Sequence, residues 1–259
     1  ALQANARVGD RAVLLFPSGP DYVAAFFGCL YAGVIAVPAY PPESARRHHQ
    51  ERLLSILTDA EPRLLLTSSG LRAPLLHMDE LSGEGAPQLL CVDELEPGIA
   101  QGWQPVALQA DDIAFLQYTS GSTRFPRGVM ITQQAVLHNA RAIIRHGVQI
   151  RSGDRAVSWL PYYHDMGLVG LLLTPLVCQI SVDYLNTRDF AMRPRLWLKL
   201  LSENRGTISF SPPFGYDLAA RRVRDDELAG YDLRSWRVAG VGAEMIRPET
   251  LARFADRLA

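Results

Sequence analysis

The fold is decided by residues 11–38, which read RAVLLFPSGPDYVAAFFGCLYAGVIAVP. An apolar strand is expected at Arg11–Phe16, followed by a turn at Pro17–Pro20 and a helix that continues to about Ala32. A second apolar strand follows this helix, and Pro38 closes it. Neither strand alternates polar with apolar residues, a pattern typical of strands buried on both faces of a parallel sheet. This stretch therefore predicts a β-α-β unit.

The alternation of strands and helices continues along the chain. Helical periodicity at 46–60 precedes a third strand at 63–67, and a loop-rich connection follows at 82–104. Further strands are expected at 113–118, 129–131, 156–160, 180–184, 207–210 and 236–241, and helices at 132–146, 166–176, 194–202, 214–224 and 248–258. We therefore expect an α/β fold of two successive parallel-sheet subdomains, residues 1–104 and residues 105–259, truncated at both ends.

Composition excludes several functions. The 259 residues carry 26 basic and 27 acidic side chains, a net charge of −1 that argues against nucleic-acid or membrane-surface binding. The cysteines, Cys29, Cys91 and Cys178, are odd in number and far apart, so neither a disulfide framework nor a metal cluster is expected. No signal peptide or membrane span is evident, and a reducing cytoplasm is the expected location.

The segment at 118–129, YTSGSTRFPRGV, has the composition of an anion-binding loop. A strand runs into small and hydroxylated residues, glycines permit close approach to the backbone, and two arginines supply fixed positive charge. An ordinary Ser/Gly surface loop is the alternative reading of this composition. The candidate ligands are Thr119, Ser120, Gly121, Ser122, Thr123, Arg124, Arg127 and Gly128.

Two further segments place polar or small residues after a strand. In Ser158–Leu168, SWLPYYHDMGL, the pair His164-Asp165 stands where a helix begins, at the carboxyl edge at which open α/β sheets bind ligands. A helix N-cap with a satisfied histidine is the alternative. Gly242-Ala243-Glu244 follows the strand at 236–241, where a Gly-Ala step lets a flat ring approach the backbone, although an ordinary strand–helix turn has the same pattern.

These segments resemble those of adenylate-forming enzymes. The 118–129 segment is similar to the family's phosphate loop, T-S-G-S-T-G-x-P-K-G-V, with Arg124 in place of the usual glycine and Arg127 in place of the usual lysine. An arginine directly after Ser-Thr is typical of the fatty acyl-AMP ligase branch, and L-P-x-x-H-D-M-G-L at 160–168 resembles the same branch. Gly242-Ala243-Glu244 resembles the family's G-A-E-P element, with Met245 in place of proline.

The resemblance implies a reaction and a set of roles. In this branch a fatty carboxylate attacks the α-phosphate of ATP, with Mg²⁺, to give acyl-AMP and pyrophosphate. The acyl group then passes to the phosphopantetheine thiol of an acyl carrier protein or of a carrier domain in a polyketide or nonribosomal peptide synthase. The implied roles are phosphate binding by 119–128, catalysis by His164, adenine and acyl seating by Gly242, Ala243 and Glu244, and acyl binding by His164, Asp165, Met166, Phe214 and Tyr216.

The chain also departs from the family pattern. Its one lysine, Lys199, lies in a helical stretch of the large domain and does not match the family's catalytic lysine, which belongs to a C-terminal domain absent from this chain. We therefore expect part of the large N-terminal domain of a fatty acyl-AMP ligase, with the activity of the isolated chain left open. The alternatives are an acyl-CoA synthetase or amino-acid adenylation domain, and a non-catalytic acyl- or nucleotide-binding remnant.

Overall fold

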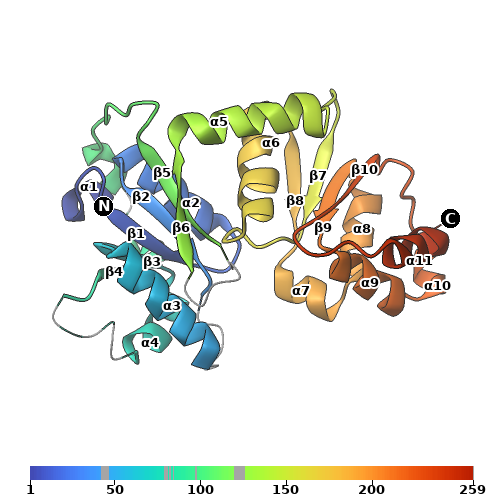
Figure 1. Cartoon of the computed structure of the whole chain (residues 1–259), viewed down its shortest axis with the longest axis horizontal. Coiled ribbons are helices and arrows are strands. Elements are labelled where there is room, and N and C mark those ends of the chain that lie inside the picture. Colours follow the sequence, from blue (N-terminus) through green and yellow to red (C-terminus); the bar gives the residue numbers. More distant parts are fainter. Residues whose placement is uncertain are drawn as a thin grey trace. The chain divides into compact units, whose positions relative to one another are not determined.

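The computed structural model describes residues 1–41, 47–78, 81, 83, 85–96, 98–119 and 126–258. The expected α/β fold is confirmed: the chain divides into two compact units, Ala1–Val136 and Leu137–Ala259, each with its own sheet (Figure 1). None of the described helices combines the length with the apolar character needed to cross a membrane.

In the first unit the described strands form one sheet in the order β4-β3-β1-β2-β5-β6, parallel except for the β5–β6 pair. The strands are β1 (Arg11–Leu15), β2 (Ile35–Ala39), β3 (Leu64–Thr67), β4 (Gln88–Cys91), β5 (Ile113–Thr119) and β6 (Arg127–Thr132). The helical elements are α1 (Leu2–Asn5), α2 (Pro20–Ala32), α3 (Arg47–Ala60), α4 (Ser69–Leu76), η2 (Val92–Glu94) and η3 (Ile99–Gly102).

The predicted β-α-β unit forms because its strands are apolar on both faces. Every residue of β1 from Ala12 to Leu15 is fully buried, so helices cover the strand on both sides. Helix α2 ends at Gly33, whose φ of 69° lies in the left-handed region that glycine adopts without strain. The chain can therefore reverse directly into β2.

The boundary between the units differs from the expected one after residue 104. The strand β5 pairs in parallel with β2 through Ala36 and Phe115, and β6 pairs antiparallel with β5. Both strands thus extend the first sheet, and the compact units divide after Val136, inside α5 (Gln133–Ala142). This helix begins where expected, because the Thr132 hydroxyl accepts a hydrogen bond from the Ala135 N–H at 3.1 Å.

In the second unit the described strands form an all-parallel sheet in the order β10-β9-β7-β8. The strands are β7 (Arg155–Ser158), β8 (Ser181–Tyr184), β9 (Ile208–Ser211) and β10 (Val238–Val241). Two segments have π-helical hydrogen bonding: η4 (Ile143–Gly147), which continues α5, and η5 (Met166–Leu173), which continues into α6 (Thr174–Cys178). The remaining helices are α7 (Thr187–Met192), α8 (Arg195–Glu203), α9 (Pro213–Arg222), α10 (Asp225–Leu228) and α11 (Pro248–Leu258).

The two faces of the second sheet are used differently, and β9 shows the division. Ile208 and Phe210 lie on the face covered by η4 and η5. Ser209 points to the opposite face, where its hydroxyl donates to the Val157 carbonyl at 2.6 Å and accepts from the Trp197 indole N–H at 2.8 Å. Because successive strand residues alternate between faces, one strand serves both layers.

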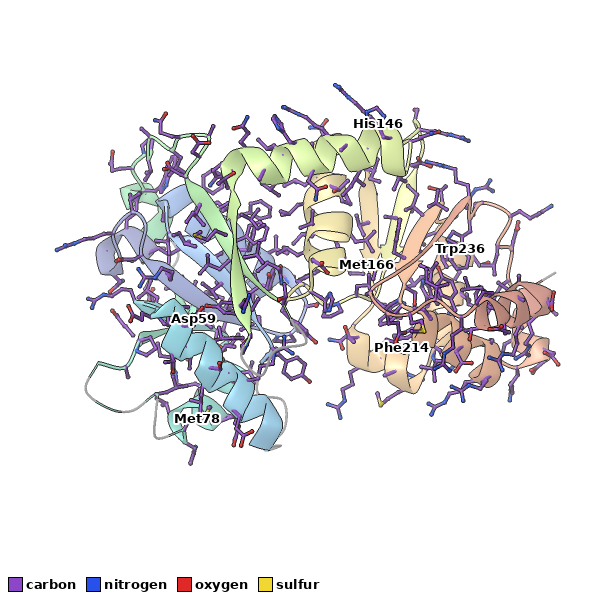
Figure 2. All side chains as sticks on the ribbon, viewed as in Figure 1. Asp59, Met78, His146, Met166, Phe214 and Trp236 are labelled. Atoms are coloured by element: carbon purple, nitrogen blue, oxygen red, sulfur yellow. The ribbon has the colours of Figure 1, made fainter. Side chains whose placement is uncertain are left out.

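The face with Ser209 packs against an aromatic core. Trp197 is fully buried at its centre, and rings surround it at centroid distances between 5.3 and 6.5 Å. These rings are Trp159, Phe190, Tyr216, Trp236 and Phe254 (Trp236 is labelled in Figure 2). This core therefore covers one face of the sheet, and the face that carries Ile208 and Phe210 packs against other elements.

A buried ion pair ties the start of β7 to the start of β10. Asp154, whose side chain is 4% exposed, accepts two hydrogen bonds from the Arg237 guanidinium, at 3.0 and 2.5 Å. Arg237 also donates to the Val148 and Gln149 carbonyls. Burial by itself would raise the pKa of Asp154, but hydrogen bonds from Arg237, the Arg151 N–H and Thr207 outweigh burial and lower this pKa to about 2.

We predict that this carboxylate makes stability depend on pH in the acid range. Because its pKa is depressed in the folded state, the stabilisation of about 2 kcal/mol is fully present above the ordinary aspartate pKa and is lost as the pH falls through about 2. At neutral pH, the free energy of unfolding in urea should therefore be lower for Asp154→Asn than for the unchanged protein. This difference should shrink at low pH. Asp256→Asn, on the exposed face of α11, is the control and should change stability little at every pH. A difference for Asp154→Asn that is constant with pH would contradict the assignment.

Candidate functional site

The topology of the second sheet brings its candidate residues to one edge. In the order β10-β9-β7-β8, the connection that leaves β7 leads to β8 on one side, and the connection that leaves β9 leads to β10 on the other. The two connections therefore diverge between β7 and β9, which is the position at which parallel α/β sheets bind ligands. The loop after β7 carries His164 and Asp165, and the loop after β10 carries Gly242 and Ala243. All the strands are parallel, so these loops share the carboxyl edge of the sheet.

His164 and Asp165 form an exposed pair at the start of η5. The His164 Nδ1 lies 2.8 Å from the Asp165 Oδ1, and the same carboxylate oxygen accepts the Met166 N–H at 2.7 Å. Asp165 therefore caps the helix, as the alternative interpretation expects, and also holds the imidazole. The hydrogen bond from His164 and that from the Met166 N–H hold the pKa of Asp165 below its ordinary value, against the effect of burial. The pair remains open to solvent, with side chains 51% and 69% exposed.

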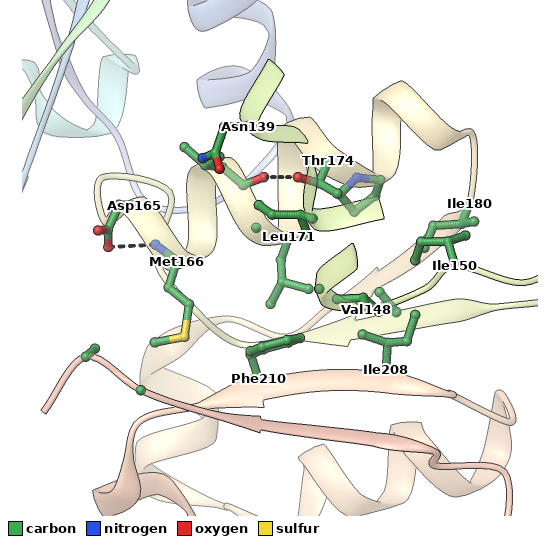
Figure 3. Close-up of a pocket in the computed structure, with 18 of the residues that line it drawn as sticks. Asn139, Val148, Ile150, Asp165, Met166, Leu171, Thr174, Ile180, Ile208 and Phe210 are labelled. Carbon is green, nitrogen blue, oxygen red and sulfur yellow. Dashed lines mark hydrogen bonds between the residues drawn. The ribbon is translucent and has the colours of Figure 1, made fainter. Parts of the chain in front are cut away.

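A cavity of about 560 Å³ lies on the sheet face that carries Ile208 and Phe210 (Figure 3). Asp165 and Met166 lie at one end of it, and Ile150 and Ile180 lie at the other. Gly242 and Ala243 also line it. The volume is in the range of pockets that enclose small organic ligands.

The wall of this cavity is apolar. Aliphatic and aromatic side chains supply most of it, among them Ile143, Val148, Ile150, Leu171, Ile208 and Phe210. The lining residues with polar side chains are Asn139, Asp165 and Thr174, and the Thr174 hydroxyl already donates to the Val169 carbonyl at 2.7 Å. A hydrocarbon chain suits such a wall, because a buried polar group would find few partners there.

The Phe210 ring packs against the backbone of β10 because Gly240 has no side chain. A Cβ at Gly240 would lie 2.0 Å from two carbon atoms of this ring, so only glycine allows the ring to rest on the backbone. Gly240 lies beside Phe210 in the β9–β10 register. The ring therefore forms the floor of the cavity instead of projecting into it.

The residues after β10 combine strain with a helix contact. Ala243 has a φ of 70°, a left-handed conformation that alanine adopts at a cost of about 1–2 kcal/mol. The Glu244 carboxylate accepts a hydrogen bond from the Phe214 N–H at 2.8 Å, in the first turn of α9, where the helix dipole favours negative charge. Gly242 and Ala243 thus face the cavity, while Glu244 is engaged by a helix.

Two residues expected to border an acyl pocket do not line this cavity. Tyr216 is 2% exposed, donates its hydroxyl hydrogen to the Gly240 carbonyl at 2.7 Å and packs in the aromatic core. Phe214, which is labelled in Figure 2, is 51% exposed, and its ring meets the Trp159 ring edge-on, with the ring centroids 5.6 Å apart. Tyr216 is on the far side of the sheet because α9 turns this position toward Trp197 and Trp236.

The candidate phosphate loop belongs to the first unit, and Ser120, Gly121, Ser122, Thr123 and Arg124 lie outside the described residues. Its two ends form the β5–β6 hairpin, in which exposed Thr119 lies opposite exposed Arg127. Tyr118, one residue before Thr119, anchors the loop end of this hairpin: its hydroxyl donates to Asp59 at 2.5 Å, and a Cβ on Gly128 would lie 2.9 Å from its ring. Gly128 is therefore required by the Tyr118 ring.

The described residues contain no group of three or more His, Cys, Asp or Glu side chains that could hold a metal ion. Nor does Lys199 lie at the carboxyl edge: its ammonium group pairs with Glu203 one turn along α8, at 3.6 Å, and its side chain is 46% exposed. The structure thus assigns this lysine an ordinary place on a helix surface.

Sequence reasoning missed most of the cavity wall. Phe210, Ile208 and Leu171 read as ordinary core positions, and only the alternation along β9 could have shown that Phe210 faces away from Trp197. The alternation separates the two faces of the strand, but it does not show which face packs against helices and which borders a cavity. That depends on the elements that cover each face of the sheet, and the pattern of one strand does not identify them.

The sequence profile of AMP-binding enzymes matches residues 1–259. The chain belongs to the AMP-binding enzyme family. Among curated members it is 39% identical over 256 residues to the medium-chain-fatty-acid–[acyl-carrier-protein] ligase JamA of Moorena producens, and 38% identical over 259 residues to the 4-hydroxyphenylalkanoate adenylyltransferase of Mycobacterium tuberculosis. These alignments cover 98% and 97% of this chain but 43% and 41% of the relatives, so the chain spans less than half of their length.

A solved structure has the same fold. The fatty acyl-adenylate ligase from L. pneumophila, in complex with acyl adenylate and pyrophosphate, superposes with a TM-score of 0.90 at 37% identity, over 98% of this chain and 43% of that chain. The similarity extends across both units of this AMP-binding family member.

Gly240 provides a test of how this family member shapes the cavity. We predict that Gly240→Ala lowers the free energy of unfolding by about 1–3 kcal/mol, because the added methyl group displaces the Phe210 ring. Adding Phe210→Leu should recover part of this loss, which a double-mutant cycle in urea would measure. Gly242→Ala, one residue after the same strand, serves as the control, because a Cβ there would meet no atom within 4 Å. Equal effects of the two alanine substitutions would contradict the role given to Gly240.

Proposed function

We propose that this chain contributes the acyl site and the phosphate loop of an enzyme that joins a fatty acid to ATP, forming acyl adenylate and pyrophosphate. The observation that carries the proposal is the apolar cavity, one end of which is formed by Asp165 and Met166, and which Gly242 and Ala243 also line from the loop after β10. A carboxylate held at this edge could place its hydrocarbon chain in the cavity. The names of the similar proteins, a fatty-acid ligase and a fatty acyl-adenylate ligase, support the same class of reaction.

The reaction joins two anions. A carboxylate oxygen of the fatty acid attacks the α-phosphorus of ATP, a new C–O–P linkage forms, and the bond from the α-phosphorus to the bridging oxygen breaks as pyrophosphate leaves. Neutralisation of charge and in-line positioning are therefore the main requirements. In the proposal, residues 119–128 hold the β- and γ-phosphates, and Arg127 contributes a charge that stays positive at all relevant pH values. Mg²⁺ remains a prediction from the family resemblance.

His164 is assigned to the fatty carboxylate. Its Nδ1 is engaged by Asp165, so Nε2 is the nitrogen that can meet the substrate. Asp165 also accepts the Met166 N–H, and this second bond holds the carboxylate, and through it the imidazole, at the start of η5. In the proposal, Asp165 acts as a positioning residue for His164, and Gly242 and Ala243 leave room for the adenylate.

The proposed acceptor of the acyl group is the phosphopantetheine thiol of a carrier protein. The name of JamA, a ligase that acts with acyl carrier protein, supports it, as does the arginine after Ser-Thr in the phosphate loop. Coenzyme A is the competing acceptor. If the complete gene product forms acyl-coenzyme A and does not acylate a carrier protein, coenzyme A is the acceptor.

Exchange of radiolabelled pyrophosphate into ATP tests the proposed function. We predict that the complete gene product catalyses exchange that depends on a fatty acid, and that His164→Ala lowers its rate by about a hundredfold. His77→Ala, a substitution of an exposed histidine after α4, should leave the rate unchanged. Running the 259-residue chain alongside shows whether it suffices by itself. No fatty-acid-dependent exchange in the complete gene product would contradict the proposal.

A further inference from the structure

Three glycines line the cavity although none of them is required by the backbone. Gly147, Gly170 and Gly242 have no φ in the left-handed region, and a Cβ at each would meet no atom within 4 Å. Both usual reasons for a glycine, a positive φ and a close approach, are therefore missing. What the three positions share is the cavity itself.

Gly170 is the least expected of the three, because it lies in the middle of η5. Glycine in a helix interior costs about 1 kcal/mol relative to alanine. Gly167, one turn earlier in the same segment, shows what a required glycine looks like: a Cβ there would lie 2.2 Å from the Pro161 carbonyl oxygen. Gly170 has no such neighbour, so packing does not account for it.

The position of Gly170 along the cavity indicates what its missing side chain does. Going along η5 and α6, the lining residues begin with Asp165 and Met166 and end with Thr174 and Pro175, and Gly170 lies between these pairs. Across from this helix lie β9 residues on the sheet face. A side chain at Gly170 would therefore fill the cavity part-way between the Asp165 end and the Ile180 end.

We propose that Gly170 sets the length of the acyl chain that the cavity admits. This inference rests on the proposed function. The absence of a side chain keeps the passage open to the apolar far end at Ile150 and Ile180, so a long unbranched chain can pass. A larger residue closes the passage at mid-length and restricts the site to short acids.

The experiment compares Gly170→Leu with the unchanged protein over a series of unbranched acids from hexanoate to palmitate. Two quantities are measured on the complete gene product: pyrophosphate exchange, and displacement of a fluorescent fatty acid in the absence of ATP. We expect hexanoate to be used within about twofold of the unchanged rate, and palmitate to lose about fourfold for each methylene that is no longer buried. Gly70→Leu, on the exposed face of α4, is the matched control and should leave the profile unchanged.

Gly170→Ala keeps the test decisive if the leucine variant fails to fold. Alanine favours the helix, so its thermal unfolding temperature should rise or hold while its preference moves toward shorter acids. A folded Gly170→Leu protein with an unchanged chain-length profile would overturn the inference and leave the proposed function intact. Where the leucine variant does not fold, an unchanged profile of Gly170→Ala would do the same. An unchanged protein that neither binds nor activates any of the acids would overturn both.

Discussion

The parallel direction of the strands in the second sheet is the constraint on which the site depends. Because β7, β8, β9 and β10 all run the same way, the loops that leave them meet at one edge. The alternation along β9 then separates the two faces. Ser209 joins the aromatic core through Trp197, and Phe210 is left to form the floor of a cavity. A rigid face and a hollow face thus come from the same few strand residues.

Rigidity on one face allows the other face to remain open. The Asp154–Arg237 pair ties β7 to β10, and Arg237 also donates to the carbonyl of Val148, which lines the cavity. The Gly240 backbone supports the Phe210 ring from below. These contacts hold two residues of the cavity wall, Val148 and Phe210, in place.

Much of this architecture could be predicted from the sequence, since apolar runs, prolines and caps mark local structure. The β-α-β unit at 11–38, the cap at Thr132 and the helical segment from Met166 follow that logic. The membership of β6 in the first sheet could not be predicted, because it depends on antiparallel pairing with β5 across a connecting loop. The π-helical hydrogen bonding of η5 and the inward placement of Tyr216 likewise depend on tertiary contacts that no local pattern carries.

In the proposed function, the cavity beside Asp165 and Met166 receives the hydrocarbon chain of the substrate. A crystal structure of the complete gene product with a non-hydrolysable acyl-adenylate analogue that carries an unbranched saturated chain tests this claim most directly. We predict that the hydrocarbon chain of the analogue lies between η5 and the β9 residues Ile208 and Phe210, and passes Gly170. An analogue whose chain lies elsewhere, with this cavity unchanged, would contradict it.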